Sequence, residues 1–241
     1  MNKKKVVIVS ACRTAIGSLN KSLKNISAEN LGAAVIKDSI AKTKIEKKEV
    51  DEIILGQVLT GGTGQNPARQ ASIKSGLPVE TPAYVVNQVC GSGLRSIVSG
   101  FQSISSNNSN IIIAGGQENM SLAPHAIHLR DGKKLGDAKL IDTMIQDGLW
   151  DAFNEYHMGM TAENVAEKFQ ITRDEQDHFA LNSQEKALEA QKHNKFEKEI
   201  INFKIKSKKS EIDFSKDEHP RDGISLDSLS RLKPVFKKDR T

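Results

Sequence analysis

Cysteine 90 is the residue in this sequence whose type and surroundings best suit nucleophilic chemistry. It follows the apolar run Tyr84–Val86 and precedes the glycine-rich residues 91–93. Apolar residues at helical spacing continue from Leu94 to Ile104. This order predicts a strand, a tight turn and a helix. Cys90 is therefore expected at the carboxyl end of a strand, where α/β sheets place their ligands.

A turn of this kind favours a reactive thiolate at Cys90. The first turn of a helix has unpaired N–H groups and a positive partial charge, and the thiolate is the nucleophilic form. Gly91 and Gly93 let a substrate approach the backbone closely, and the same N–H groups could hold the oxyanion formed at an attacked thioester. A buried structural cysteine fits the position equally well. The other cysteine, Cys12, has no such setting and is expected to be structural.

Two other motifs resemble ligand sites but lack the partners that such sites require. His125 and His128 have the spacing of a metal pair, yet no further ligand follows closely, so two loop histidines and no metal site are expected. Residues 61–67 are glycine-rich, but no Gly-Lys-Ser/Thr follows, and Pro67 replaces the glycine of a dinucleotide motif. We expect this stretch to form a tight loop at a site wall or an interface.

Composition indicates a globular protein. The 241 residues are 37% hydrophobic and 27% charged, which suits one large domain or two modest ones. No apolar run could span a bilayer, and Val6–Val9 is too short for a signal-peptide core, so a cytoplasmic protein with no membrane partner is expected. The net charge of +5 reflects lysine clusters at residues 42–48 and 204–209, interpreted as solvated faces. No aromatic residues interleave with them, so nucleic acid is not an expected partner, whereas a polyanionic small ligand is compatible.

Alternating strands and helices in the first half must position Cys90. Strands are predicted at Val6–Val9, Ile53–Leu55, Tyr84–Val86 and Ile111–Ala114. Helices are predicted from Ser27 to about Thr43, from the Asn66 cap to Gly76, and after residue 93. Buried strands that alternate with helices predict an α/β fold whose parallel sheet is covered on both faces.

The second half of the chain has a different character. We place a domain boundary near Ser121, which divides the chain into residues 1–120 and 121–241. Residues 121–150 appear irregular in pattern, and helices are predicted near Thr161 and from Thr172, which forms a capping box with Glu175. Residues 201–206 alternate like an edge strand, and the tail from Asp217 is expected to be a loop.

The segment around Cys90, Asn-Gln-Val-Cys-Gly-Ser-Gly-Leu, closely resembles the thiolases, in particular the acetyl-CoA acetyltransferases. Other segments match this family in order: residues 13–17, where Ala15 replaces the usual proline, and residues 64–70, 115–121 and 156–159. The resemblance implies a thiolase-like α/β fold with a mixed or parallel sheet covered by helices. Residues 1–120 would be its N-terminal core without the final return strand, and residues 121–241 its inserted α+β loop domain.

The same resemblance implies an acyltransferase that condenses two acetyl-CoA molecules to acetoacetyl-CoA and catalyses the reverse thiolysis. Cys90 would carry the acyl group as a thioester, which divides one difficult step into two easier ones. The CoA contacts implied are Leu149, His157, Met158, Arg221 and Ser228. CoA thioesters would be substrates, with no further cofactor. The loop from Pro124 to about Thr143 resembles the segment that joins thiolase dimers, which implies a homotetramer.

One departure from the family pattern concerns its second half. That half carries an asparagine–histidine pair, a Gly-His-Pro motif and a second cysteine, none of which occurs here; His219-Pro220 lacks the preceding glycine. We therefore expect the 241 residues to be a partial enzyme, inactive alone because the base for Cys90 is missing. Exposed apolar surface is expected to make them self-associate.

Three alternatives to this interpretation stay open. A ketoacyl synthase-like condensing enzyme shares the fold and the nucleophilic cysteine, although residues 157–159 favour a thiolase. A non-catalytic CoA or lipid carrier of thiolase fold is the second, and an intact Cys90 argues against it. The third is a subunit that works with a separate chain bearing the second half.

Overall fold

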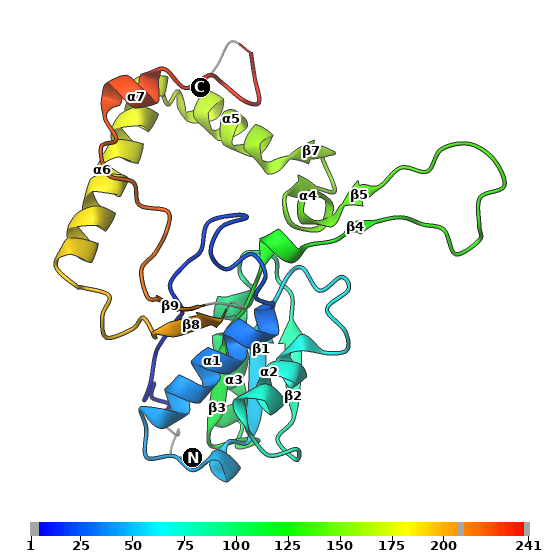
Figure 1. The fold of residues 1–241 in the computed structure, drawn as a ribbon, viewed down its shortest axis with the longest axis vertical. Helices are drawn as coiled ribbons and strands as arrows, with labels where there is room; N and C mark the ends of the chain where they lie inside the picture. The colour runs from blue at the N-terminus through cyan, green and yellow to red at the C-terminus, as the bar shows by residue number, and fades with distance from the viewer. Residues whose placement is uncertain (1–4, 207–209, 239–241) are drawn as a thin grey trace.

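A three-stranded parallel sheet forms the centre of the first half of the molecule (Figure 1). The structure, a computed structural model, describes residues 5–206 and 210–238. The strands are β1 (Glu52–Gly56), β2 (Ala83–Val86) and β3 (Ile112–Gly116), in the order β2-β1-β3. The middle strand is the most buried, since Ile53 and Ile54 are both 0% exposed.

Helices cover both faces of this sheet, as predicted. Side chains alternate across a strand, so Ile53 and Leu55 face one way and Ile54 the other. Ile53 and Leu55 pack in one cluster with residues of α1 (Ala28–Ala41) and α2 (Pro67–Ser75), among them Ile36 and Ala71. Helix α3 (Ser92–Ser105) contacts β1 and β3, and Figure 1 shows it behind the sheet, opposite α1 and α2.

The ends of α2 follow the local signals in the sequence. The side chain of Asn66 accepts a hydrogen bond from the N–H of Arg69 at 3.1 Å, and Pro67 occupies the first helical position. Gly76 ends the helix with φ +82°, a left-handed conformation that glycine adopts at little cost. The predicted helix from Asn66 to Gly76 is confirmed.

Two apolar segments of the first half are exposed, one of which was predicted to be a buried strand. The predicted buried strand at Val6–Val9 is wrong: residues 5–12 form no strand, and Ile8 is 78% exposed. Among the described strands, none pairs with it, so its backbone lacks the neighbour that a strand requires. On α3, Leu94 is 69% and Phe101 is 56% exposed, so only the side toward the sheet is packed.

Short strands and helices of different lengths, the longest being α6 (Arg173–Lys192), make up the second region, defined as residues 121–206 and 210–238. Two short 3₁₀ helices come before them in the chain, η1 (Lys47–Glu49) in the first half and η2 (Met120–Leu122) at the junction. The elements of the second region are β4 (His125–Ala126), β5 (Ile141–Asp142), α4 (Thr143–Gly148), β6 (Trp150–Asp151), β7 (Tyr156–His157), α5 (Met158–Phe169), α6, β8 (Phe203–Lys206), β9 (Glu211–Phe214) and α7 (Leu226–Ser230). The capping box of Thr172 and Glu175 and the strand within residues 201–206 are confirmed. The expectation that the tail is all loop is wrong at α7, where Ser225 and Ser228 form a capping box.

The second region joins the first half through a small core and an ion pair. Phe214 on β9 packs against Ala15, Leu23 and Leu31. The guanidinium of Arg13 donates two hydrogen bonds to the carboxylate of Asp217, at 2.8 and 3.0 Å. Burial by itself would raise the pKa of Asp217, but the bonds from Arg13 and from the N–H of Ile16 outweigh it and lower that pKa.

In the described ranges, no helix has both the length and the apolar character needed to cross a membrane.

Candidate active site

The carboxyl ends of the three parallel strands meet at one edge of the sheet, and Cys90 lies there. Because β1, β2 and β3 run the same way, the residues that follow them are gathered at this edge. Cys90 follows β2 and directly precedes Gly91, the cap of α3. Its side chain is exposed. Within the part of the chain that the structure describes, Cys90 is therefore not a buried structural cysteine. The predicted strand-to-helix turn is confirmed.

Hydrogen bonds within residues 87–92 hold this turn. The N–H of Gly91 donates to the carbonyl of Gln88 at 3.0 Å, and the N–H of Ser92 donates to the carbonyl of Val89 at 3.1 Å. The Asn87 side chain accepts from the N–H of Val89 at 2.9 Å. The expectation that the N–H groups following Cys90 would hold an oxyanion is therefore wrong for Gly91 and Ser92, because a turn this tight uses both donors itself.

Glycines let α3 pack directly on the ends of the strands. A Cβ at Gly56, the last residue of β1, would lie 2.7 Å from the Cβ of Ser92 and 2.6 Å from the nitrogen of Gly93. Real Cβ atoms do not approach this closely, so the position needs glycine. On the open side, a Cβ at Gly93 would meet no described atom within 4 Å. The first turn of α3 is thus packed against the end of β1 on one side, and at Gly93 no described atom covers it on the other.

Glu118 is a half-buried carboxylate at the same edge that the sequence reasoning did not single out. One of its oxygens accepts from the N–H of Val58 at 2.8 Å, and both accept from the N–H of Leu59 at 3.3 Å. Burial raises the pKa of Glu118, although these backbone bonds partly offset it. The carboxylate therefore ties the segment after β1 to the segment after β3. A glutamate after a glycine pair carries no periodic signal that could have revealed this role.

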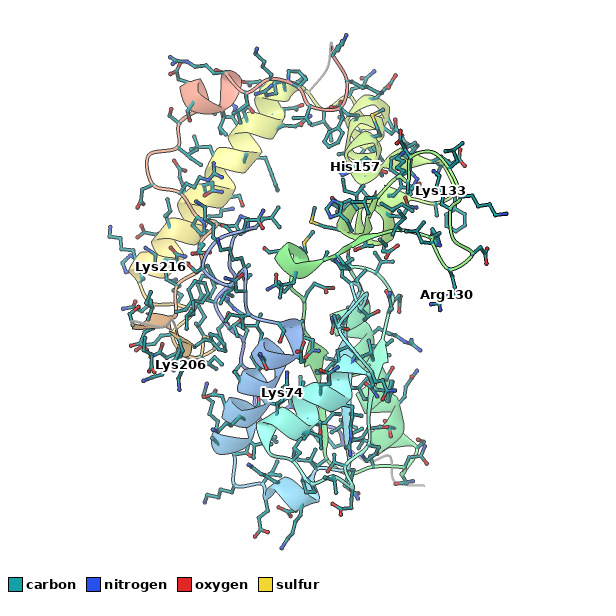
Figure 2. The ribbon with its side chains drawn as sticks, turned by 45° about the vertical axis from the view of Figure 1, so that its right-hand side comes forward. Lys74, Arg130, Lys133, His157, Lys206 and Lys216 are labelled. Atoms are coloured by element: carbon teal, nitrogen blue, oxygen red, sulfur yellow. The ribbon has the colours of Figure 1, made fainter. Side chains whose placement is uncertain are left out.

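Three of the five expected CoA contacts come together at one hairpin. Strands β6 and β7 pair Trp150 with His157, and the N–H of Met158 donates to the carbonyl of Leu149 at 2.8 Å. The ring of His157 stacks on Phe236 with centroids 5.0 Å apart, and its Nδ1 accepts from the N–H of Gly159 at 3.0 Å. Figure 2 shows His157 in this part of the second region. Met158 is 45% exposed.

The other two expected contacts lie near α6 and α7. The N–H of Arg221 donates to the side chain of Gln184 on α6 at 2.9 Å, and Arg221 is exposed. The hydroxyl of Ser228 donates to the carbonyl of Ser225 at 2.8 Å and accepts from its N–H at 3.0 Å. In Figure 1 α7 lies over the end of α6, on the other side of the second region from β7. The structure thus divides the five residues into two groups.

His125 and His128 were expected to be loop histidines, which is wrong for His125 because it belongs to a short strand. His125 lies on β4 with its Nε2 3.8 Å from a carboxylate oxygen of Asp142, its partner on β5. Among the described residues, no three His, Cys, Asp or Glu side chains are grouped as a metal site requires.

Comparison with known proteins identifies the fold. The family model "Thiolase, N-terminal domain" matches residues 6–241. The chain belongs to the thiolase family. A crystal structure of the acetyl-CoA acetyltransferase of Bacillus anthracis superimposes with a TM-score of 0.94 at 37% sequence identity, over 97% of this chain and 59% of that one. The predicted thiolase-like α/β fold is confirmed.

Curated thiolase relatives match nearly all of this chain and only part of their own length. An acetyl-CoA acetyltransferase of Rhizobium meliloti is 54% identical over 241 residues, which is 100% of this chain and 61% of the relative. The cytosolic acetyl-CoA acetyltransferase of Rattus norvegicus is 49% identical, over 98% of this chain and 59% of the relative. The chain therefore spans less than two thirds of these thiolases.

Proposed function

We propose that this thiolase is an acetyl-CoA acetyltransferase in which Cys90 carries the acyl group. The observation that carries the proposal is the exposed Cys90 at the strand-to-helix turn of a thiolase fold. The names of the relatives in the comparison support the substrate, acetyl-CoA. They favour a thiolase over a ketoacyl synthase-like enzyme or a carrier.

In the proposed reaction, the Cys90 thiolate attacks the carbonyl carbon of acetyl-CoA. A new carbon–sulfur bond forms to Sγ, the bond to the CoA sulfur breaks, and CoA leaves as a thiolate that takes up a proton. A second acetyl-CoA loses a methyl proton to a base, which the family resemblance assigns to the second half of a thiolase. The resulting carbanion attacks the acyl carbonyl, the bond to Sγ breaks, and acetoacetyl-CoA and the Cys90 thiolate are released. Thiolysis is the reverse. The small-molecule partners are acetyl-CoA, acetoacetyl-CoA and CoA, and the proposed reaction uses no cofactor.

We propose that residues 121–241 cover CoA, with contacts from Leu149, His157, Met158, Arg221 and Ser228. The hairpin of the first three presents an apolar surface and an aromatic ring, which suit the pantetheine arm. The exposed guanidinium of Arg221 suits a phosphate of CoA, because its planar donors match phosphate oxygens.

We further propose a tetramer in the cytoplasm. The loop between β4 and β5 extends away from the rest of the molecule, and Arg130 and Lys133 lie on it (Figure 1, Figure 2). Leu135 on this loop is 93% exposed, an apolar side chain suited to burial between subunits. The rat relative's name supports the compartment.

Isotope transfer tests the proposed function. The full-length protein, meaning these 241 residues joined to the second half that the relatives carry, is mixed with [1-¹⁴C]acetyl-CoA. The mixture is quenched in acid and digested, and the labelled peptide is sequenced. We expect the label on the peptide that contains Cys90, and none in the variant Cys90→Ser. Cys12→Ser is the matched control and should label normally. Label at Cys12, or equal labelling of Cys90→Ser, would refute the proposal.

A further inference from the structure

The turn that presents Cys90 contains a strained residue immediately before it. Val89 has φ +48°, in the left-handed region. A β-branched side chain crowds the backbone there, so valine occupies this region rarely and only where neighbouring structure imposes it. Val89 is also 49% exposed, so packing of its own side chain explains little of this conformation. Some other group must hold the backbone.

The Asn87 side chain already bonds the N–H of Val89, and the N–H of Ser92 bonds the carbonyl of Val89. The hydroxyl of Ser92 is placed to add a further hold on this backbone. It accepts a hydrogen bond from the N–H of Gln88 at 2.8 Å and donates one to the carbonyl of Val89 at 2.6 Å. One bond holds the peptide unit between residues 87 and 88, and the other holds the unit between residues 89 and 90, so the two lie on either side of the Gln88–Val89 peptide. Ser92 itself cannot shift, because it is 4% exposed and lies against Gly56 at the end of β1.

We propose that Ser92 is a positioning residue for Cys90, and that its hydroxyl holds Val89 in the left-handed conformation. A relaxed Val89 would rotate the chain just before Cys90 and so move the nucleophile relative to the bound thioester. Misplacement of a reacting atom slows the chemical step more than it weakens binding. This inference rests on the proposed function and adds to it a residue that touches no reacting atom.

Ser96 provides a matched control on the same helix. It is 0% exposed, and its hydroxyl donates to the carbonyls of Gly93 and Gly115, both at 2.7 Å. Ser96→Ala therefore removes a buried hydroxyl from α3, as Ser92→Ala does, but leaves the bonds to Gln88 and Val89 intact. A role that is only structural predicts similar effects of the two changes.

The kinetic test uses the full-length protein and the rate at which [¹⁴C]acetyl-CoA acetylates Cys90. We expect Ser92→Ala to acetylate on the order of tenfold more slowly with less than about a twofold change in KM, as for an interaction that serves the transition state alone. Ser96→Ala should acetylate at a rate within about twofold of the unmodified protein. Equal slowing by the two changes, or a change in KM alone, would overturn the proposal.

A rescue experiment tests the link through Val89. Glycine adopts positive φ without strain, so Val89→Gly should make the hydroxyl unnecessary. The double variant Ser92→Ala/Val89→Gly is expected to acetylate within about threefold of Val89→Gly alone. If adding Ser92→Ala slows the glycine variant as much as it slows the unmodified protein, Ser92 does not act through Val89 and the proposal fails.

A crystal structure of Ser92→Ala separates this proposal from the proposed function. We expect φ of residue 89 to leave the left-handed region in that variant and to stay positive in Ser96→Ala. A positive φ in Ser92→Ala would overturn the role of Ser92 even if Cys90 carries the acyl group. Absence of label on Cys90 in the unmodified protein would instead refute the function.

Discussion

The turn around Cys90 and the expected CoA contacts are built in opposite ways. The turn joins the parallel strand β2 to α3, and its bonds span few residues. The expected CoA contacts lie in the second region, in two groups around β7 and around α7. The proposed nucleophile is thus fixed by local structure on a packed core, whereas the proposed binding surface depends on how distant segments are assembled.

The largest expected change in the free energy of unfolding comes from the core beneath the sheet edge. It tests whether this core stabilises the first half of the molecule, which carries the turn around Cys90. Ile53→Ala removes a fully buried side chain from the middle strand and should lower the free energy of unfolding by about 3 kcal/mol. Phe153→Ala, in the second region, removes a side chain that is 96% exposed and should change it by less than about 0.5 kcal/mol. Urea denaturation measures both. Similar losses would remove the contrast between the two regions.

The connection between the regions is the next test. Arg13→Ala removes two charge-assisted bonds to Asp217 and one to Glu199, the last at 2.7 Å. We expect a loss of about 2 kcal/mol in urea denaturation, with faster proteolysis of the second region. Lys204→Ala breaks an exposed pair with Glu211 and serves as the control, with no measurable loss expected, because water screens an exposed ion pair. A smaller effect for Arg13→Ala than for Lys204→Ala would contradict this account.

The pH dependence of stability should have opposite signs in the two regions. The pKa of Glu118 is raised by burial, so its contribution is present below its ordinary pKa of 4.5 and is lost as pH rises through the folded value. Burial opposes ionisation of Asp217 too, but Arg13 leaves its pKa lowered, so its contribution is present above 3.8 and is lost as pH falls through the folded value.

Unfolding free energies measured from pH 3 to 7 check these signs. Glu118→Gln should remove a decline in stability as pH rises above 4.5, and Asp217→Asn should remove a decline as pH falls below 3.8. If both variants change stability on the same side of the pH profile, the pKa values of Glu118 and Asp217 are not shifted in opposite directions.

The smallest expected effects distinguish the two groups of CoA contacts. His157→Ala removes the ring stacked on Phe236 and should raise the KM for acetyl-CoA about fivefold, or about 1 kcal/mol. The hydroxyl of Ser228 is already bonded to Ser225, so Ser228→Ala should raise KM by less than about twofold. Steady-state kinetics on the full-length protein measure both. A larger effect at Ser228 would mean that its hydroxyl leaves the cap to bind CoA.

Local signals in the sequence predicted the part of the fold that carries Cys90. Apolar runs and cap residues located β1, β2, β3 and the helices between them within a few residues. The same reasoning failed at Val6–Val9, because an apolar run does not show whether a neighbouring strand exists to pair with it. It missed α7, whose capping box uses Ser228 where the usual pattern has a glutamate or glutamine.

The sequence predicted which residue occupies the candidate site better than it predicted the backbone conformation and the hydrogen bonds around that residue. The position of Cys90 follows from strand, turn and helix in order. The left-handed φ of Val89 does not, since valine is among the residues least suited to that conformation. Nor does the burial of Glu118, which depends on β1 and β3 lying side by side. Contacts between residues far apart in the chain leave no periodic trace in the sequence.

Rapid-quench measurement of label on Cys90 is the sharpest test of whether this thiol carries the acyl group. The full-length protein is mixed with [1-¹⁴C]acetyl-CoA and then with CoA. The account predicts label on the Cys90 thiol within one turnover and its return to CoA as acetyl-CoA when CoA is added. Turnover to acetoacetyl-CoA with no label ever found on Cys90 would contradict it.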